Sequence, residues 1–111
     1  MAVVTKVLIP AKTAEVTQTT QYTATNVTAI IDKFTATNYD TVARTISVNL
    51  VASGGSATND NLIVKTKTLQ PAETYTFPEL VGQVLSSGSF VSTIASTGTS
   101  INIRASGREI A

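Results

Sequence analysis

Short runs of alternating apolar and polar residues, separated by turn residues, limit the fold of this chain more than any other feature. Residues 45–50, Thr-Ile-Ser-Val-Asn-Leu, show the alternation most clearly. Successive side chains of a β-strand point to opposite faces of its sheet. The pattern therefore predicts a strand in which Ile46, Val48 and Leu50 enter a core, while the polar residues face water or a partner.

Similar runs occupy most of the sequence. They predict further strands over residues 3–9, 17–28, 29–38, 62–69, 74–77, 89–97 and 100–105. We expect Pro10 to end the first strand, because proline has no N–H to donate to a strand ladder. The Thr-rich run 17–28 is expected to be weakly buried or at a sheet edge. Residues 78–85 are the one helical candidate, of one or two turns, because Pro78 starts the segment and Glu79 lies in its first turn.

Seven or eight short strands at this spacing predict an all-β fold, an antiparallel β-sandwich with one short helical turn near residues 78–85. A chain of 111 residues can bury one core and is too short for two, so we expect a single domain over residues 1–111. The pattern alone leaves two connectivities open, immunoglobulin-like and jelly-roll.

The chain contains neither cysteine nor histidine, which excludes several kinds of catalysis. Thiol nucleophiles, thiolate metal sites, Ser-His-Asp triads and zinc hydrolases all need one of these residues. Asp32, Glu73 and Glu79 could in principle supply a glycosidase carboxylate pair, but Glu73 fits a turn and Glu79 a helix start. The Asn59-Asp60-Asn61 segment fits a polar loop tip better than a calcium site. We therefore predict no enzyme, no catalytic residue, no cofactor and no metal site.

Charge is low and nearly balanced, with eight basic residues, seven acidic residues and a net charge of +1. This balance predicts no nucleic-acid partner and no anionic-membrane partner. An uncharged stretch runs from Leu80 to Ile103, but glycines interrupt it and Ser and Thr fill it, so we do not expect it to span a membrane. The apolar run 7–9 is too short for the core of a signal peptide.

Hydroxyl side chains take the place of the missing charges, with 20 Thr and 10 Ser. Charge depletion is typical of interface cores, and uncharged strand edges need a covering element. Segments 17–28 and 84–100 carry no charged residue to guard an edge. We therefore expect neighbouring subunits to cover the edges, including copies of the chain itself. A structural or assembly protein is the first interpretation, a binding module the second, and an enzyme a distant third.

Five segments resemble small virion structural proteins of tailed bacteriophages, in particular the jelly-roll cement, or decoration, proteins on the outside of the capsid. The segments are 31–38 (IDKFTATN), 50–55 (LVASGG), 73–75 (ETY), 78–85 (PELVGQVL) and 103–110 (IRASGREI). The likeness covers roughly residues 30–111. It implies a jelly-roll without enzymatic activity, located on the capsid surface of the virion, with the major capsid protein as partner. The family has no catalytic residues to transfer.

Two other functions remain open: a neck, tail or fibre-base component of the virion, and a carbohydrate-binding β-sandwich module. Arg104, Arg108 and Ile110 are the candidate partner contacts, because arginine forks pair with carboxylates and Ile110 could fill an apolar pocket. In one interpretation the stretch Arg104–Ile110 is a tail that swings out and, with the adjoining loops, contacts the capsid or the next cement subunit. In the other, residues 101–110 form the last strand of the sandwich and both arginines are solvated.

Overall fold

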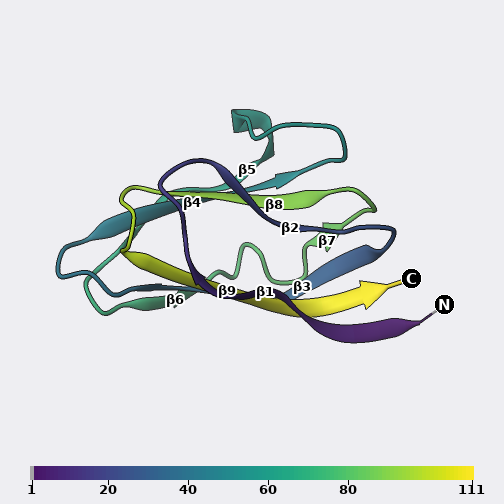
Figure 1. Ribbon diagram of the computed structural model, residues 1–111, viewed down its shortest axis with the longest axis horizontal. Helices are drawn as coiled ribbons and strands as arrows, with labels where there is room; N and C mark the ends of the chain where they lie inside the picture. The colour runs from purple at the N-terminus through teal and green to yellow at the C-terminus, as the bar shows by residue number, and fades with distance from the viewer. Residues whose placement is uncertain (1) are drawn as a thin grey trace.

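Two antiparallel sheets face each other in the computed structural model, which describes residues 2–111 (Figure 1). The first sheet has the order β1-β9-β3-β6, and a short strand, β7, also pairs with β3. Its strands are β1 (Val3–Thr13), β3 (Thr28–Asn38), β6 (Thr74–Thr76), β7 (Val84–Leu85) and β9 (Ile101–Ile110). The second sheet has the order β2-β8-β4-β5. Its strands are β2 (Thr19–Thr23), β4 (Arg44–Val51), β5 (Leu62–Leu69) and β8 (Phe90–Ala95), and the 3-10 turn η1 (Asn59–Asn61) precedes β5.

The connections between the strands are those of a jelly-roll. Along the chain the strands pass back and forth between the two sheets, except at β4–β5, which pair directly, and β6–β7, which both pair with β3. An immunoglobulin-like sandwich instead keeps several consecutive strands side by side in one sheet. The predicted all-β sandwich is therefore confirmed, and of the two open connectivities the structure has the jelly-roll.

A single core fills the space between the two sheets. Phe34 and Phe77 are fully buried there and meet edge to face, with ring centroids 5.4 Å apart. Ile46 and Val48 are also fully buried, as the alternation predicts, whereas Leu50 packs against the core and stays half-buried. This packing supplies most of the folding free energy of such a sandwich.

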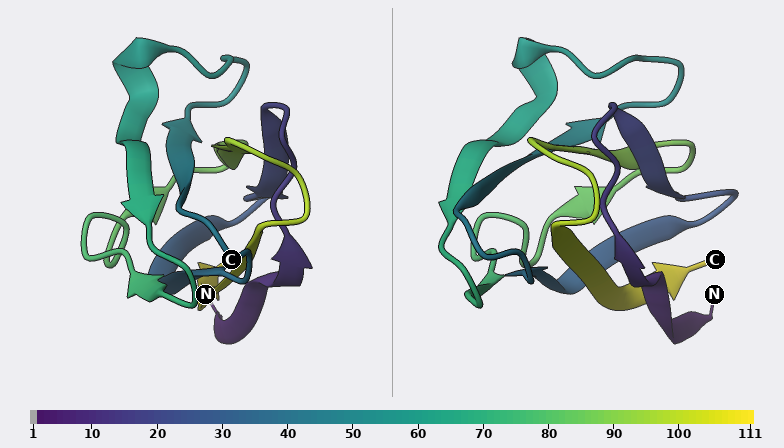
Figure 2. Two further views of the ribbon diagram at one scale, coloured as in Figure 1. Left: turned by 90° about the vertical axis from the view of Figure 1, so that its left-hand side faces the viewer. Right: turned by 60° about the vertical axis from the view of Figure 1, so that its left-hand side comes forward.

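The polar face of β4 differs from the prediction, because it is buried as well. The side chains of Ser47 and Asn49 are 8% and 3% exposed. The segment between β4 and β5 bonds to Asn49 through Thr58 and Asn61, and Figure 2 shows this segment on the outer side of the second sheet. The hydroxyl of Ser47 accepts a hydrogen bond from the backbone N–H of Thr66 at 2.8 Å. A strand pattern with one apolar face therefore does not by itself show that the other face is open.

The first strand continues through Pro10, so the expectation that Pro10 ends it is wrong. β1 is an edge strand whose only partner is β9. A proline is tolerated in an edge strand because no second strand there needs a hydrogen bond from its missing N–H. The ladder between β1 and β9 also shifts register between Val7 and Ile9 and again between Ile9 and Lys12. Such bulges accommodate a residue that cannot pair.

The helical segment expected over residues 78–85 is not formed. Two consecutive turns occupy its place, with the N–H of Leu80 bonded to the Phe77 carbonyl and that of Gln83 to the Leu80 carbonyl, both at 3.2 Å. The N–H of Gly82 bonds instead to the carbonyl of Ile31 at 2.7 Å, and β7 follows on β3. The segment pairs with a neighbouring strand rather than with itself, and Gly82 reaches the required φ of +84° without strain.

Of the two segments expected to be unguarded edges, one contains an edge strand of the second sheet and the other an interior strand. β2 lies at the edge of the second sheet, as predicted, but is only five residues long. β8, within the segment 84–100, lies inside the sheet between β2 and β4 and exposes no edge. Within residues 2–111 no helix combines the length and the apolar character that crossing a bilayer requires.

The C-terminal segment is the interior strand β9, which pairs with β1 on one side and with β3 on the other. The interpretation of residues 101–110 as the last strand is therefore correct and the tail does not swing out, although Arg108 is paired with Asp32 rather than solvated. Gly107 is buried, and a Cβ atom there would collide with the backbone carbonyl of Ile30 and lie 2.9 Å from the Leu8 side chain. The two ends of the chain meet past the last pair of the β1–β9 ladder, where Ala2 and Ala111 exchange backbone hydrogen bonds (Figure 2).

Candidate functional site

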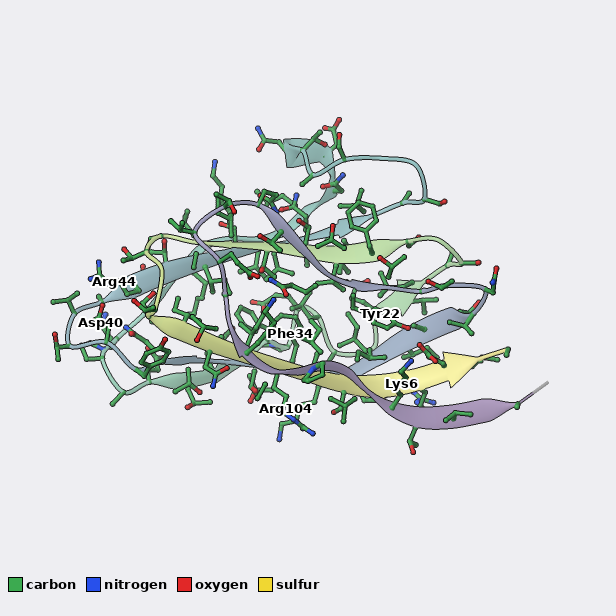
Figure 3. All side chains as sticks on the ribbon, in the orientation of Figure 1. Lys6, Tyr22, Phe34, Asp40, Arg44 and Arg104 are labelled. Atoms are coloured by element: carbon green, nitrogen blue, oxygen red, sulfur yellow. The ribbon has the colours of Figure 1, made fainter. Side chains whose placement is uncertain are left out.

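The three predicted contact residues lie on one surface, the outward side of the first sheet. Along β9 the odd-numbered residues 101, 103, 105 and 107 are buried, whereas the even-numbered residues 102–110 are exposed or half-buried. Arg104, Arg108 and Ile110 therefore share the side that faces away from the core. Figure 3 shows Arg104 projecting from the β9 ribbon on the side opposite the second sheet.

Cross-strand pairing extends this surface over the first sheet, because residues directly opposite each other share a face. We call it the outer face. Its residues are Val3, Thr5, Val7, Thr28, Ile30, Asp32, Lys33, Thr35, Thr37, Thr74, Thr76, Val84, Asn102, Arg104, Ser106, Arg108 and Ile110. None of them belongs to the buried class, and most carry a hydroxyl or an aliphatic side chain.

Most side chains at one end of the outer face are aliphatic, with Arg108 among them, and we call it the apolar end. Val3 pairs with Ile110, and Val84 pairs with Ile30 in the neighbouring row. Val3 and Val84 are 59% and 57% exposed, and Val7 is exposed further along β1. Several exposed aliphatic side chains grouped on one sheet face are typical of a protein-contact surface.

Arg108 lies in the middle of the outer face and is held by Asp32. Its guanidinium donates to both carboxylate oxygens, from Nε at 3.2 and 3.0 Å and from Nη2 at 2.9 Å. Asp32 can reach it because the ladder between β3 and β9 shifts register between Ile31 and Lys33, which turns Asp32 outward. The pair leaves the two charges neutralised and Arg108 fixed against the sheet.

Lys33 and Arg104 lie beside this pair and border a shallow depression. Lys33 stands opposite Ser106, and Arg104 stands opposite Thr35, on adjacent strands. These four side chains line a hollow of about 160 Å³. Neither cation forms a salt bridge within residues 2–111. The hollow therefore combines two positive charges with two hydroxyl groups.

Glu109 lies on the core side of β9 and binds side chains from two other strands. The hydroxyl of Tyr22 on β2 donates to its carboxylate, and the ammonium of Lys6 on β1 lies 3.3 Å from it. The Tyr22 hydrogen bond, with the Lys6 charge as a further cause, lowers the pKa of Glu109. Burial and the same carboxylate raise the pKa of Tyr22 well above its ordinary value. Sequence patterning missed this cluster because its members come from three distant segments.

The outward side of the second sheet carries a groove of about 210 Å³ that sequence patterning also missed. Its amide groups bind one another. Gln18 donates to Ser92 at 2.8 Å, and Asn49 donates to the Thr58 carbonyl at 2.9 Å and to the Asn61 side chain at 2.7 Å. Because these groups already have partners, we interpret the network as one that stabilises the loop over the sheet and not as a ligand-binding site.

The three candidate carboxylates take part in separate local contacts. Asp32 holds Arg108, Glu73 accepts the N–H of Gln70 at 2.7 Å, and Glu79 accepts the Tyr75 hydroxyl at 3.3 Å. The Asn59–Asn61 segment forms η1, capped by the Thr58 side chain. Over residues 2–111 no group of three or more His, Cys, Asp or Glu side chains is arranged to hold a metal ion.

Searches of protein-family models, curated proteins and solved structures found no match for the chain.

Proposed function

We propose that the chain is a non-enzymatic capsid cement protein of a tailed bacteriophage, which binds the major capsid protein on the outside of the shell and bridges its subunits. The observation that carries this proposal is the outer face, a broad sheet surface that carries mainly hydroxyls and aliphatic side chains, with one Lys and no Glu. Such a surface loses little side-chain entropy and little hydration on contact, because it carries few Lys and Glu. The resemblance of residues 30–111 to cement proteins supports the same proposal.

Stabilisation would come from contact area summed over many copies. Each copy bridges neighbouring capsid subunits through a modest contact, and a closed lattice holds all contacts at once. A shell covered in this way resists the pressure of packaged DNA without tight binding by any one copy. The rigid jelly-roll suits this role, since its long strands β1, β3 and β9 present the outer face without a loop that must first be ordered.

The outer face is a better contact surface than the opposite side of the molecule. On the second sheet, the loop between β4 and β5 covers the strands and the polar groups bind one another. The groove on this side, a candidate sugar site, has no aromatic side chain in its lining on which a sugar ring could stack. We therefore rank the carbohydrate-binding alternative below the cement protein.

The test is to mix purified chain with DNA-free capsid shells of the phage that encodes it and to locate the bound copies by electron microscopy. A cement protein decorates the whole shell with hundreds of copies, whereas a neck, tail or fibre-base component occupies one vertex with a handful. No binding to shells, together with glycan binding by the pure chain, would replace the proposal with the carbohydrate-binding alternative.

A further inference from the structure

The ion pairs of the molecule leave positive charge on the outer face. Within residues 2–111, four salt bridges engage half of the basic residues, and the unpaired basic residues are Lys33, Lys65, Lys67 and Arg104. Lys65 and Lys67 belong to β5 of the second sheet, where Lys67 lies 4.3 Å above the Tyr75 ring. Lys33 and Arg104 belong to the outer face, and its one carboxylate, Asp32, is engaged by Arg108.

Lys33 and Arg104 are positioned to act on one ligand group. They lie diagonally across adjacent strands, because Lys33 is opposite Ser106 and Arg104 is opposite Thr35. Diagonal neighbours on one sheet face lie within reach of long side chains. The hollow that they share with Thr35 and Ser106 offers a guanidinium fork, an ammonium group and two hydroxyl donors to a single acceptor. We call these four residues the cationic niche.

A carboxylate fits the cationic niche better than a nucleic-acid phosphate. The arginine fork matches a carboxylate in geometry and charge, and the same face already shows such a pair between Arg108 and Asp32. Nucleic-acid binding needs many cations along a backbone, whereas this face has two unpaired cations, with the exposed Val7 opposite Ser106. An aliphatic side chain beside a cationic niche suits a protein segment that carries an acidic side chain next to an apolar one.

We propose that the cationic niche binds an Asp or Glu side chain of the partner protein, with Arg104 as the fork, Lys33 as the second charge, and Thr35 and Ser106 as hydroxyl donors. The inference deepens the proposed function and rests on it for the identity of the partner. The exposed Val7, which is opposite Ser106 on β1, then receives an aliphatic residue next to that acid.

The direct test is an NMR titration of the isotope-labelled full chain with the blocked peptide Ser-Asp-Val-Glu-Val-Asp-Ser. The control peptide has Asn and Gln in place of the acids. We expect shifts at the amides of Lys33, Thr35, Arg104 and Ser106 with the acidic peptide alone. The variant Lys33→Gln/Arg104→Gln should weaken this binding by about tenfold, as expected for two lost charge-assisted contacts. The shifts should also shrink as salt is added.

A matched variant separates the cationic niche from bulk charge. Lys65→Gln/Lys67→Gln removes the same charge from the second sheet and should bind the acidic peptide like the wild type. Equal weakening by both variants, or no shifts in the niche, would overturn the proposal. Stronger shifts there with a single-stranded oligothymidine than with the peptide would overturn it in favour of a phosphate ligand. Thermal unfolding of each variant confirms that the chain is folded.

Shell binding then distinguishes this proposal from the cement function. If shells bind the wild type but do not bind the Lys33→Gln/Arg104→Gln variant, both proposals are supported. If shells bind both forms equally, the cationic niche is not the contact, while the cement function stands. If shells bind neither form but the acidic peptide still binds at Lys33 and Arg104, the cement function fails and the carboxylate site stands.

Discussion

The outward sides of the two sheets are built from similar residues and have different roles. Both carry Thr, Ser and Asn at alternate strand positions. On the second sheet, the buried Ser47 bonds to the backbone of the neighbouring strand β5, and the buried Asn49 bonds to the loop between β4 and β5. On the outer face, Thr35 and Ser106 stay accessible beside two unpaired cations. Polar strand residues thus stabilise the fold where a loop covers them and become available for contact where none does.

Gly107→Ala is expected to give the largest effect, because it disturbs the strand that carries the outer face. The new methyl group would meet the backbone carbonyl of Ile30, which cannot move without breaking the ladder between β3 and β9. We expect a loss of about 3 kcal/mol or more in unfolding free energy, measured by urea denaturation. Gly98→Ala is the control, since nothing lies within 4 Å of its added Cβ. A stable Gly107→Ala variant would mean that β9 is not packed as described.

Asn49→Ala tests whether the network on the second sheet is structural. The substitution removes a buried amide group that donates to the Thr58 carbonyl and to the Asn61 side chain. We expect a loss of about 1–3 kcal/mol in unfolding free energy. The matched outer-face substitution, Thr35→Ala, should change the value by no more than about 0.5 kcal/mol. Equal costs for the two would remove the contrast between the sheets.

Glu109→Gln should change how stability depends on pH. The pKa of Glu109 is lowered in the folded chain by Tyr22 and Lys6, so its contribution is present above the unfolded pKa, about 4.3. That contribution is lost as the pH falls through the lower folded pKa. We expect the variant to be about 1 kcal/mol less stable at pH 7 and to lose less of its stability on acidification.

The same cluster predicts an effect at high pH. The pKa of Tyr22 is raised in the folded chain, so its contribution is complete below the unfolded value, about 10, and declines as the pH rises above it. Tyr22→Phe should remove that decline. Urea denaturation of the three proteins between pH 3 and 11 checks both statements, and parallel pH curves for wild type and variants would contradict them.

Lys33→Gln/Arg104→Gln should have the smallest effect on stability. Both side chains are exposed and form no salt bridge within residues 2–111. We expect a change of no more than about 0.5 kcal/mol in unfolding free energy, alongside the loss of acidic-peptide binding. A large loss of stability would assign the two cations to the fold rather than to a partner.

Strand positions could largely be predicted from the sequence, because alternation is a local property. β3, β4 and β5 lie close to where the period of two places them. The sheet face on which each side chain of β3 lies could not be predicted along the whole strand. Strict alternation separates Asp32 from Lys33, but the register shift between Ile31 and Lys33 places both side chains on the outer face. Such a shift depends on the partner strand, which is 70 residues or more away in the sequence.

The candidate contact residues show the same division. Arg104, Arg108 and Ile110 could be selected from the sequence as contact residues, but their common face follows from the interior position of β9. Sequence patterning did not select Lys33, because nothing local shows that its charge lacks a partner. The same applies to Gly107, because nothing local in the sequence shows that its Cα lies against the backbone of Ile30.

The sequence by itself determined an all-β chain of low charge without the side chains of thiol or histidine chemistry. These properties follow from composition and from spacing between near neighbours. Only the tertiary structure decided which polar strand face is covered and that the last strand lies inside the first sheet. It also decided which cations have no carboxylate beside them. The reason is physical: strand pairing and ion pairing join residues far apart in the chain, and their partners exist only once both sheets have formed.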